Sequence, residues 1–324
     1  MFFHMIELTL QNRMNEVKKL YESLSLIGSL SLAISLPWII YKALHLQRSL
    51  NNLFGKVVVI TGASSGLGEA LAHEFYMKGC QVVLCARRRQ ELDRVRTDLM
   101  HSHSTVQTHP PIIIPLDLAD LDNLVENLKK IITVTGKVDI LINNGGVSHR
   151  GNVLSTNIDV DMKIMMVNYF GTVALTKAVL PDMVKRNEGH IVFISSVQGL
   201  IALPERSAYS ASKHAVQAFG DSLRAEVADN NISVSVISPG YIQTNLSLNA
   251  LTGSGDSYGQ MDDSTKSGYT PEYVAKKIVK AVAQKKKEMI ISSMLPKIAI
   301  FLRKYLPSLY FFAMARRAKK SSLK

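Results

Sequence analysis

Cysteine is scarce in this sequence, which contains only two among 324 residues, Cys80 and Cys85. Two thiols cannot build a disulfide framework, and their spacing does not match a metal-ligand set, so we expect both to be core residues. The histidines at residues 101–109 have no acid or thiol partner at a useful spacing, so we expect a solvated loop there and no metal. With 47% hydrophobic residues, the chain can bury one large α/β core or two small ones.

Acidic residues are absent after Glu288, in a chain whose formal net charge is +12. The end of the chain instead carries eight lysines and arginines, interleaved with aromatic and aliphatic residues. This interleaving favours an anionic membrane surface over nucleic acid as the partner. Pro296 and Pro307 divide residues 295–320 into two helices too short to span a bilayer, which predicts an interfacial helix pair. Packing of this tail against a second subunit is the alternative.

Charged residues are also missing from residues 23–41, a run of nineteen. At a rise of about 1.5 Å per residue, a helix of this length spans just under the ~30 Å hydrocarbon core of a bilayer. Trp38 and Tyr41 lie near one end, as aromatic residues do at membrane interfaces. Within an N-terminal segment of residues 1–50 we therefore expect an uncleaved single-pass anchor, rather than a cleaved signal peptide or a buried helix. Basic residues balance on its two sides and leave its orientation open.

A glycine-rich turn follows the first apolar strand, which we expect at residues 56–61. Its glycines are Gly62, Gly66 and Gly68. Small residues let the backbone approach a pyrophosphate, which would sit on the N-terminus of the helix expected near Leu67. For this motif alone, a tight strand–helix turn that is glycine-rich by chance is the alternative.

Tyr209 and Lys213 stand four residues apart in a run rich in alanine and serine. Positions i and i+4 share a helix face, so the lysine ammonium would lie beside the phenol. A phenol has a pKa near ~10, and a neighbouring ammonium would lower it towards the range that acid–base chemistry needs. Shortly before Tyr209, the apolar run 191–194 ends in Ser195 and Ser196, which places a hydroxyl at the end of a buried strand.

Together these motifs resemble the short-chain dehydrogenase/reductase family, from about Lys56 to Ile291. Apolar strands alternate with helices, which predicts an α/β fold over residues 51–292: a single doubly wound parallel sheet, or Rossmann fold. The third strand, at residues 112–116, is expected to be buried, and the last helix is expected to begin at Pro271. The strands are expected at residues 56–61, 81–85, 112–116, 140–143, 191–194, 233–237 and 288–291. Residues 293–324 form the basic, apolar tail.

The resemblance implies an oxidoreductase that moves a hydride between a nicotinamide cofactor and a carbonyl or secondary alcohol. Tyr209 would give or take the proton of the substrate oxygen, and Ser196 would bind that oxygen. Lys213 would lower the pKa of Tyr209 and hold the nicotinamide ribose. Asn168 would kink its helix and hold a water at the inner end of a proton relay.

The end of the second strand bears on the choice of cofactor. An acid there would bind the adenosine ribose of NAD, but this chain has Ala86 followed by Arg87. Arg87 can neutralise a 2′-phosphate, so NADP(H) is the expected cofactor and NAD(H) the alternative, whereas Arg88 and Arg89 are expected to be solvated. The cofactor-binding set implied by the resemblance is Gly62, Ser64, Ser65, Gly66, Leu67, Gly68, Arg87, Asp117, Asn144, Tyr209, Lys213, Ile242 and Thr244.

Residues 238–247 resemble those of a membrane-bound branch of the family, related to the 11β-hydroxysteroid dehydrogenases. That branch implies residence in the endoplasmic reticulum membrane and a lipophilic small-molecule substrate: a steroid, a retinoid, or an acyl- or alkyl-dihydroxyacetone phosphate. The family also implies a homo-oligomer, such as a dimer. The loose composition of residues 245–270 favours a mobile lid over the substrate. A catalytically silent, cofactor-binding interaction module at the membrane is the alternative function.

Overall fold

The computed structural model describes residues 14, 18, 35 and 37–321. Residues up to Ser49 and residues from Leu50 onwards form separate compact units. In the first unit, the described residues from 37 onwards are helical, and their large apolar side chains are exposed, among them Trp38 and Tyr41. Most of the expected membrane anchor, residues 23–41, lies outside the described residues, so the anchor stays a prediction.

The second unit is built on a parallel sheet of seven strands in the order β3-β2-β1-β4-β6-β7-β9. The chain starts in β1, runs outward to β3, and then returns to the other side of β1 with β4. Ligands of such sheets bind beyond the carboxyl ends of the strands at this reversal point, between β1 and β4. The strands are β1 (Val57–Thr61), β2 (Gln81–Ala86), β3 (Ile112–Pro115), β4 (Ile140–Asn143), β6 (Gly189–Ile194), β7 (Ile232–Pro239) and β9 (Glu288–Ile291).

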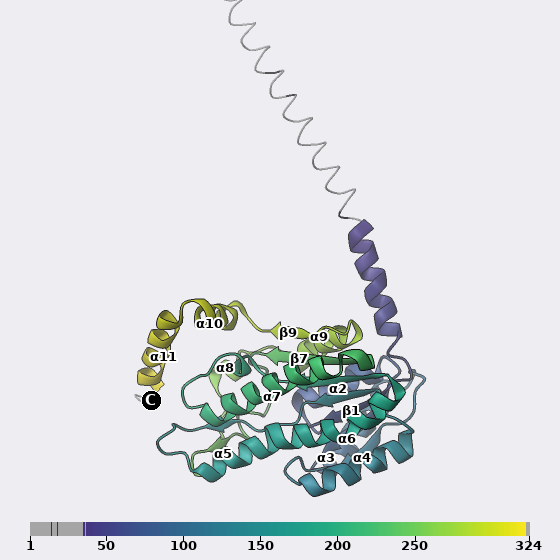
Figure 1. The fold of residues 1–324 in the computed structure, drawn as a ribbon, viewed down its shortest axis with the longest axis horizontal. Coiled ribbons are helices and arrows are strands. Elements are labelled where there is room, and N and C mark those ends of the chain that lie inside the picture. The colour runs from purple at the N-terminus through teal and green to yellow at the C-terminus, as the bar shows by residue number, and fades with distance from the viewer. Residues whose placement is uncertain (1–13, 15–17, 19–34, 36, 322–324) are drawn as a thin grey trace, which may run out of the picture. The chain divides into compact units, whose positions relative to one another are not determined.

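Two layers of helices cover the sheet, as Figure 1 shows. Because successive strand side chains point to opposite faces, Val58 and Ile60 of β1 pack with one layer, and Val57 and Val59 with the other. The first layer contains α2 (Gly66–Tyr76), α3 (Arg89–Ser102) and α9 (Pro271–Ala283). The second contains α4 (Leu121–Thr135), α6 (Gly171–Arg186) and α7 (Ser207–Glu226). The sheet is therefore buried on both faces, which explains its continuous apolar strands.

The expected doubly wound fold is confirmed, with one correction at β3. The strands expected at residues 140–143 and 288–291 have those bounds, and the last helix begins at Pro271. The expected buried strand at residues 112–116 is instead an edge strand: its three isoleucines are half-buried and Pro115 is exposed. An apolar run alone does not reveal how many neighbours its strand will have.

Among the described residues, one helical stretch is long and apolar enough to cross a membrane, Ile158–Arg186. It consists of α5 (Ile158–Met165), a π-helical turn, η1 (Met166–Phe170), and α6. Its members pack against α4 and α7, so this stretch is a helix of the protein core.

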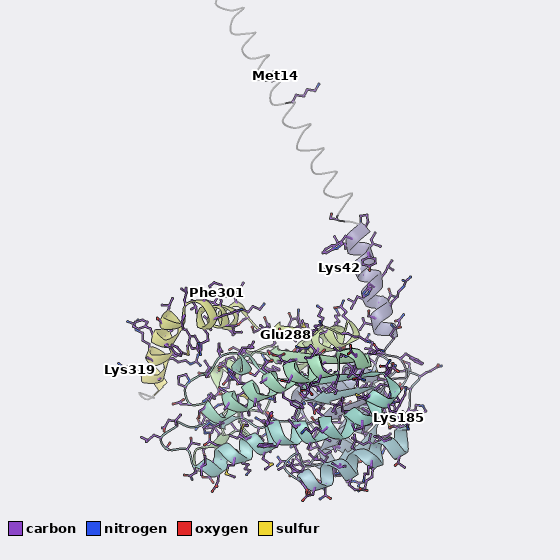
Figure 2. The ribbon with its side chains drawn as sticks, in the orientation of Figure 1. Met14, Lys42, Lys185, Glu288, Phe301 and Lys319 are labelled. Atoms are coloured by element: carbon purple, nitrogen blue, oxygen red, sulfur yellow. The ribbon has the colours of Figure 1, made fainter. Side chains whose placement is uncertain are left out.

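The tail forms two helices, α10 (Met294–Tyr305) and α11 (Pro307–Ser321). Pro307 begins the second helix, whereas Pro296 lies in the first turn of α10, where the missing N–H is tolerated. Tyr310 is buried and donates a hydrogen bond from its hydroxyl to the carbonyl of Ala202. Figure 2 shows Phe301 on α10 and Lys319 near the end of α11. The Tyr310 side chain therefore helps to fasten the tail to the body of the protein.

Candidate active site

A cleft of about 510 Å³ lies beyond the carboxyl ends of the strands. Fourteen of the fifteen predicted site residues line it, and the exception is Asn168. The fourteen are Gly62, Ser64, Ser65, Gly66, Leu67, Gly68, Arg87, Asp117, Asn144, Ser196, Tyr209, Lys213, Ile242 and Thr244. The structure thus brings together residues that are spread over most of the chain. Asn168 is buried behind the cleft wall.

The glycine-rich turn between β1 and α2 forms a narrow cradle. Gly62 and Gly66 have φ angles of +67° and +58°, in the left-handed region that favours glycine. A Cβ atom at Gly68 would overlap the carbonyl oxygen of Gly62 and lie 2.7 Å from Nδ2 of Asn144. The first N–H groups of α2 have no partner within the helix and face an approaching anion. The turn therefore fits the pyrophosphate of a dinucleotide.

The end of β4 locks this cradle in place. The amide group of Asn144 donates from Nδ2 to the carbonyl of Thr61 at 2.9 Å. The Thr61 hydroxyl in turn accepts from the backbone N–H groups of Asn144 and Gly145, both at 2.9 Å. Because these bonds join β1 to β4, they fix the cleft floor at the reversal point of the sheet.

Arginines lie at the far end of the cleft, beyond β2. Arg87 is exposed and lines the cleft together with Asp117. Arg88 is exposed, as expected, and also reaches the glycine-rich turn, with Nη2 3.2 Å from Oγ of Ser64 and 3.4 Å from Oγ of Ser65. The prediction of a solvated side chain therefore holds for Arg88, although its contact with the turn was not expected. It also holds for Arg89, which is 73% exposed.

Tyr209 and Lys213 lie on α7 at the other end of the cleft, and both are buried. The ammonium of Lys213 lies 5.8 Å from the centre of the Tyr209 ring and donates to the carbonyl of Ile194 at 2.9 Å. Ser196 follows β6, and its hydroxyl accepts from the backbone N–H of Gln198 at 3.1 Å. Phenol, hydroxyl and ammonium therefore converge on one point of the cleft.

Burial controls the titration of these groups. It raises the pKa of Tyr209, while the hydrogen bond with Ser196 and the charge of Arg150 act in the opposite direction. Burial also lowers the pKa of Lys213 to about 8. The net shift of the Tyr209 pKa is therefore upward and not downward as expected, because burial disfavours the phenolate.

Asn168 lies in the π-helical turn between α5 and α6, where a kink was expected. Its Oδ1 accepts from the backbone N–H of Val147 at 2.8 Å, and its Nδ2 donates to the Val147 carbonyl and the Ser212 hydroxyl, each at 2.9 Å. The asparagine thus joins the loop after β4 to the helix that carries Tyr209. It acts on the cleft through that loop and does not line the cleft itself.

The turn after β7 closes over the cleft between these two ends. Ile242 and Thr244 line it, and the Thr244 methyl group packs against Gly66. A Cβ atom at Gly66 would lie 3.0 Å from that methyl group, so there is little room for a side chain. The following segment also contributes to the wall, through Leu246, Ser247 and Thr265 among others. Whether this segment moves as a lid stays a prediction.

A comparison of the sequence with known families gives a direct match. Residues 56–253 match the family described as short chain dehydrogenase. The chain belongs to the short-chain dehydrogenase family. The matched residues carry the glycine-rich turn, Ser196, Tyr209 and Lys213, so this short-chain dehydrogenase is an NAD(P)-dependent oxidoreductase.

Curated relatives and solved structures agree with this assignment. The chain is 58% identical to a dehydrogenase/reductase SDR family protein 7-like of Anopheles gambiae, over 91% of this chain and 94% of the relative. It is 49% identical to dehydrogenase/reductase SDR family member 7B of Bos taurus, over 87% of each. Among crystal structures, a short-chain dehydrogenase from Streptomyces avermitilis is 28% identical with a TM-score of 0.66, covering 83% of this chain and 97% of that one.

Sequence analysis missed three polar residues of this short-chain dehydrogenase site. Besides Arg88, they are Arg150, which lines the cleft, and Asp262, its partner in an ion pair. The two partners are more than a hundred residues apart in the chain. Neither falls within a motif of the family, so no local pattern in the sequence joins them.

Proposed function

We propose that this protein is a membrane-bound, NADP(H)-preferring oxidoreductase that interconverts a carbonyl and a secondary alcohol on a lipophilic substrate. The observation that carries this proposal is the convergence of Tyr209, Lys213 and Ser196 in the cleft that also contains the glycine-rich cradle. A bound nicotinamide cofactor supplies or accepts the hydride.

Each side chain has a task set by its position. Tyr209 gives its phenolic proton to the substrate oxygen during reduction and takes it back during oxidation. Ser196 donates a hydrogen bond to the same oxygen and stabilises the charge that develops there. Lys213 holds the ribose next to the nicotinamide, and its positive charge stabilises the tyrosinate. Asn168 supports the loop at Val147 and, with an ordered water, links Lys213 to solvent.

The preference for NADP(H) is supported by the charges at the adenosine end of the cleft. No acid stands at the end of β2, where Ala86 is followed by Arg87 and Arg88. Arg88 already lies over Ser64 and Ser65, so a 2′-phosphate placed beside these hydroxyls would meet its guanidinium. NAD(H) is the alternative, since Ser65 supplies no positive charge of its own.

Membrane association is supported by the two ends of the chain. The tail helices expose large apolar side chains beside lysines and arginines, and the sequence has no acid after Glu288 to repel anionic lipids. The exposed apolar residues of the tail are Met294, Leu295, Ile298, Phe301, Tyr305, Leu306, Leu309, Phe311 and Phe312. With the uncharged run at residues 23–41, this arrangement favours a single-pass protein of the endoplasmic reticulum membrane.

A lipophilic substrate follows from that location: a steroid, a retinoid, or an acyl- or alkyl-dihydroxyacetone phosphate. We also expect a homo-oligomer such as a dimer, which would bury exposed apolar surface. Packing of the tail against the second subunit is the alternative to binding of the tail at the membrane. A catalytically silent module at the membrane is a second candidate function, and the intact set of Ser196, Tyr209 and Lys213 speaks against it.

The test uses the full chain in detergent. Binding of NADPH and NADH is titrated by fluorescence, and NADPH oxidation is followed with a panel of lipid ketones. Tyr209→Phe should bind NADPH as the unmodified protein does but lose about 10²–10⁴-fold in turnover, as removal of a general acid predicts. Normal turnover by this variant would refute the assignment of Tyr209. Turnover of no ketone, with NADPH bound, would favour the silent module.

Membrane binding is tested separately by sedimentation after washing with high salt and with alkaline carbonate. An inserted anchor stays with the membrane fraction, whereas a protein held only by its charges is released. Complete release by salt would refute the single-pass anchor and leave the catalytic proposal untouched.

A further inference from the structure

Arg150 sits at the centre of a buried charge cluster on the substrate side of the cleft. Its side chain is 8% exposed, and that of its partner Asp262 is 13% exposed. Arg150 donates from Nε and Nη2 to Asp262, from Nη1 to the Ser148 hydroxyl and the His149 carbonyl, and from Nη2 to the Ser247 hydroxyl. A guanidinium has five N–H groups, so every donor of Arg150 is used.

The cluster joins three parts of the chain that form the substrate side of the cleft. Arg150 belongs to β5 (His149–Arg150), which pairs in parallel with β8 (Leu251–Thr252). Asp262 and Ser247, which are joined by a hydrogen bond, belong to the segment at residues 245–266, which makes up most of the expected lid at residues 245–270. Arg206, whose Nη2 lies 3.5 Å from Asp262, is the N-cap residue of α7, three positions before Tyr209. One carboxylate therefore fastens the expected lid both to the loop after β4 and to the helix that carries Tyr209.

Arg150 and Tyr209 line the same cleft, so the positive charge of Arg150 acts on the phenol. The groups that act on Tyr209 are Lys213 of its own helix, Ser196 after β6, Tyr241 after β7, and Arg150 of β5. Burial raises the pKa of Tyr209, and the charge of Arg150 opposes this effect, whereas Tyr241 adds to it. Because all its donors are used within the protein, Arg150 has no N–H left to bind the substrate. Its influence must therefore come through position and charge.

We propose that Arg150 is a positioning residue for the reaction: it holds residues 245–266 as one wall of the substrate cleft and presents a fixed positive charge to Tyr209. The inference deepens the proposed function, since its second half rests on Tyr209 being the group that exchanges the proton. Its first half does not depend on the substrate at all. The two halves can be separated because lysine keeps the charge but cannot reproduce the contact in which Nε and Nη2 both donate to Oδ2 of Asp262.

The experiment compares the full chain with Arg150→Met and Arg150→Lys. Hydrogen exchange of peptides covering residues 245–266 reports the wall, and the pH dependence of the reduction of 9,10-phenanthrenequinone by NADPH reports Tyr209. In both variants, the amide hydrogens of this segment should exchange at least about tenfold faster, because both lose the two-donor contact with Asp262. Only Arg150→Met should move the pH profile, and it should move it to higher pH, because loss of a positive charge raises the pKa of the phenol.

Controls separate this role from general loss of stability. Arg186→Met removes a half-buried arginine paired with Asp182 at 2.8 Å, remote from the cleft, and should leave both readouts unchanged. The affinity for NADPH should stay within about threefold in all variants, since Arg150 contacts none of the cradle residues. Unchanged exchange in Arg150→Met, or the same change in Arg186→Met, would overturn the positioning role. An unshifted profile in Arg150→Met would overturn the charge effect, and full turnover by Tyr209→Phe would instead refute the proposed function.

Discussion

The two arginines after β2 allow a quantitative prediction about cofactor choice. Arg88 lies over the serines of the glycine-rich turn, Arg87 lines the same cleft and is exposed, and Arg89 points away to pair with Asp93 at 3.8 Å. Replacement of Arg88 by methionine removes a guanidinium from the place where a 2′-phosphate would lie. Hydrogen bonds to charged groups contribute about 1.5–3 kcal/mol, which corresponds to about 10- to 150-fold in the dissociation constant of NADPH.

NADH has no 2′-phosphate, so its affinity should change by less than about threefold in Arg88→Met. The ratio of the two dissociation constants, measured by fluorescence titration of the full chain, is therefore the informative quantity. Arg87→Met should lower the NADPH preference less, because it is Arg88 whose guanidinium already lies beside the two serines of the turn. Arg89→Met is the matched control and should change neither affinity. Equal effects of the Arg88 and Arg89 replacements, or an unchanged ratio in Arg88→Met, would refute the reasoning.

Three further predictions concern the fold. Gly68→Ala places a Cβ atom against the carbonyl of Gly62, so thermal unfolding should show a loss of about 1–3 kcal/mol together with weaker NADPH binding, and normal binding would contradict the cradle. His190 is fully buried, and burial lowers its pKa from 6.5 to about 3. Its neutral form stabilises the fold fully above pH 6.5, and below it the unfolding free energy should fall by up to about 1.4 kcal/mol per pH unit; an unchanged slope in His190→Gln would exclude this residue as the cause. Tyr310→Ala removes the contact with Ala202, so trypsin should cut the tail about tenfold faster while the melting temperature of the sheet hardly moves; unchanged cleavage would show that the tail is held elsewhere.

Local patterns in the sequence were sufficient for the fold and for most of the cleft. Two of the motifs, the glycine-rich turn and the pair Tyr209 and Lys213, each span only a few residues. The backbone geometry of each depends on its own residues. The alternation of apolar strands and helices then determines which strand ends meet at the reversal point. Residues as distant as Ser64 and Thr244 were assigned to one cleft through the resemblance to the family, and both line it.

The remainder depended on contacts that no local pattern encodes. Arg88 contacts the serines of the glycine-rich turn, and a run of three arginines does not reveal which of them will do so. The pairing of Arg150 with Asp262 requires the path of a long connecting segment. The net upward shift of the Tyr209 pKa depends on how completely the surrounding chain excludes water, which the spacing of Lys213 does not reveal.

The two edge strands of the sheet have a consequence for how copies of this protein can associate. An open strand edge tends to recruit a strand from another molecule, and proline or lysine at the edge discourages such recruitment. At one edge, β3 ends in Pro115, which has no N–H to offer. At the other, β9 begins at the exposed Glu288, directly after Lys285, Lys286 and Lys287. Both edges of the sheet therefore discourage aggregation by strand pairing between molecules. A dimer of this protein is expected to form through its helices and not by pairing of edge strands.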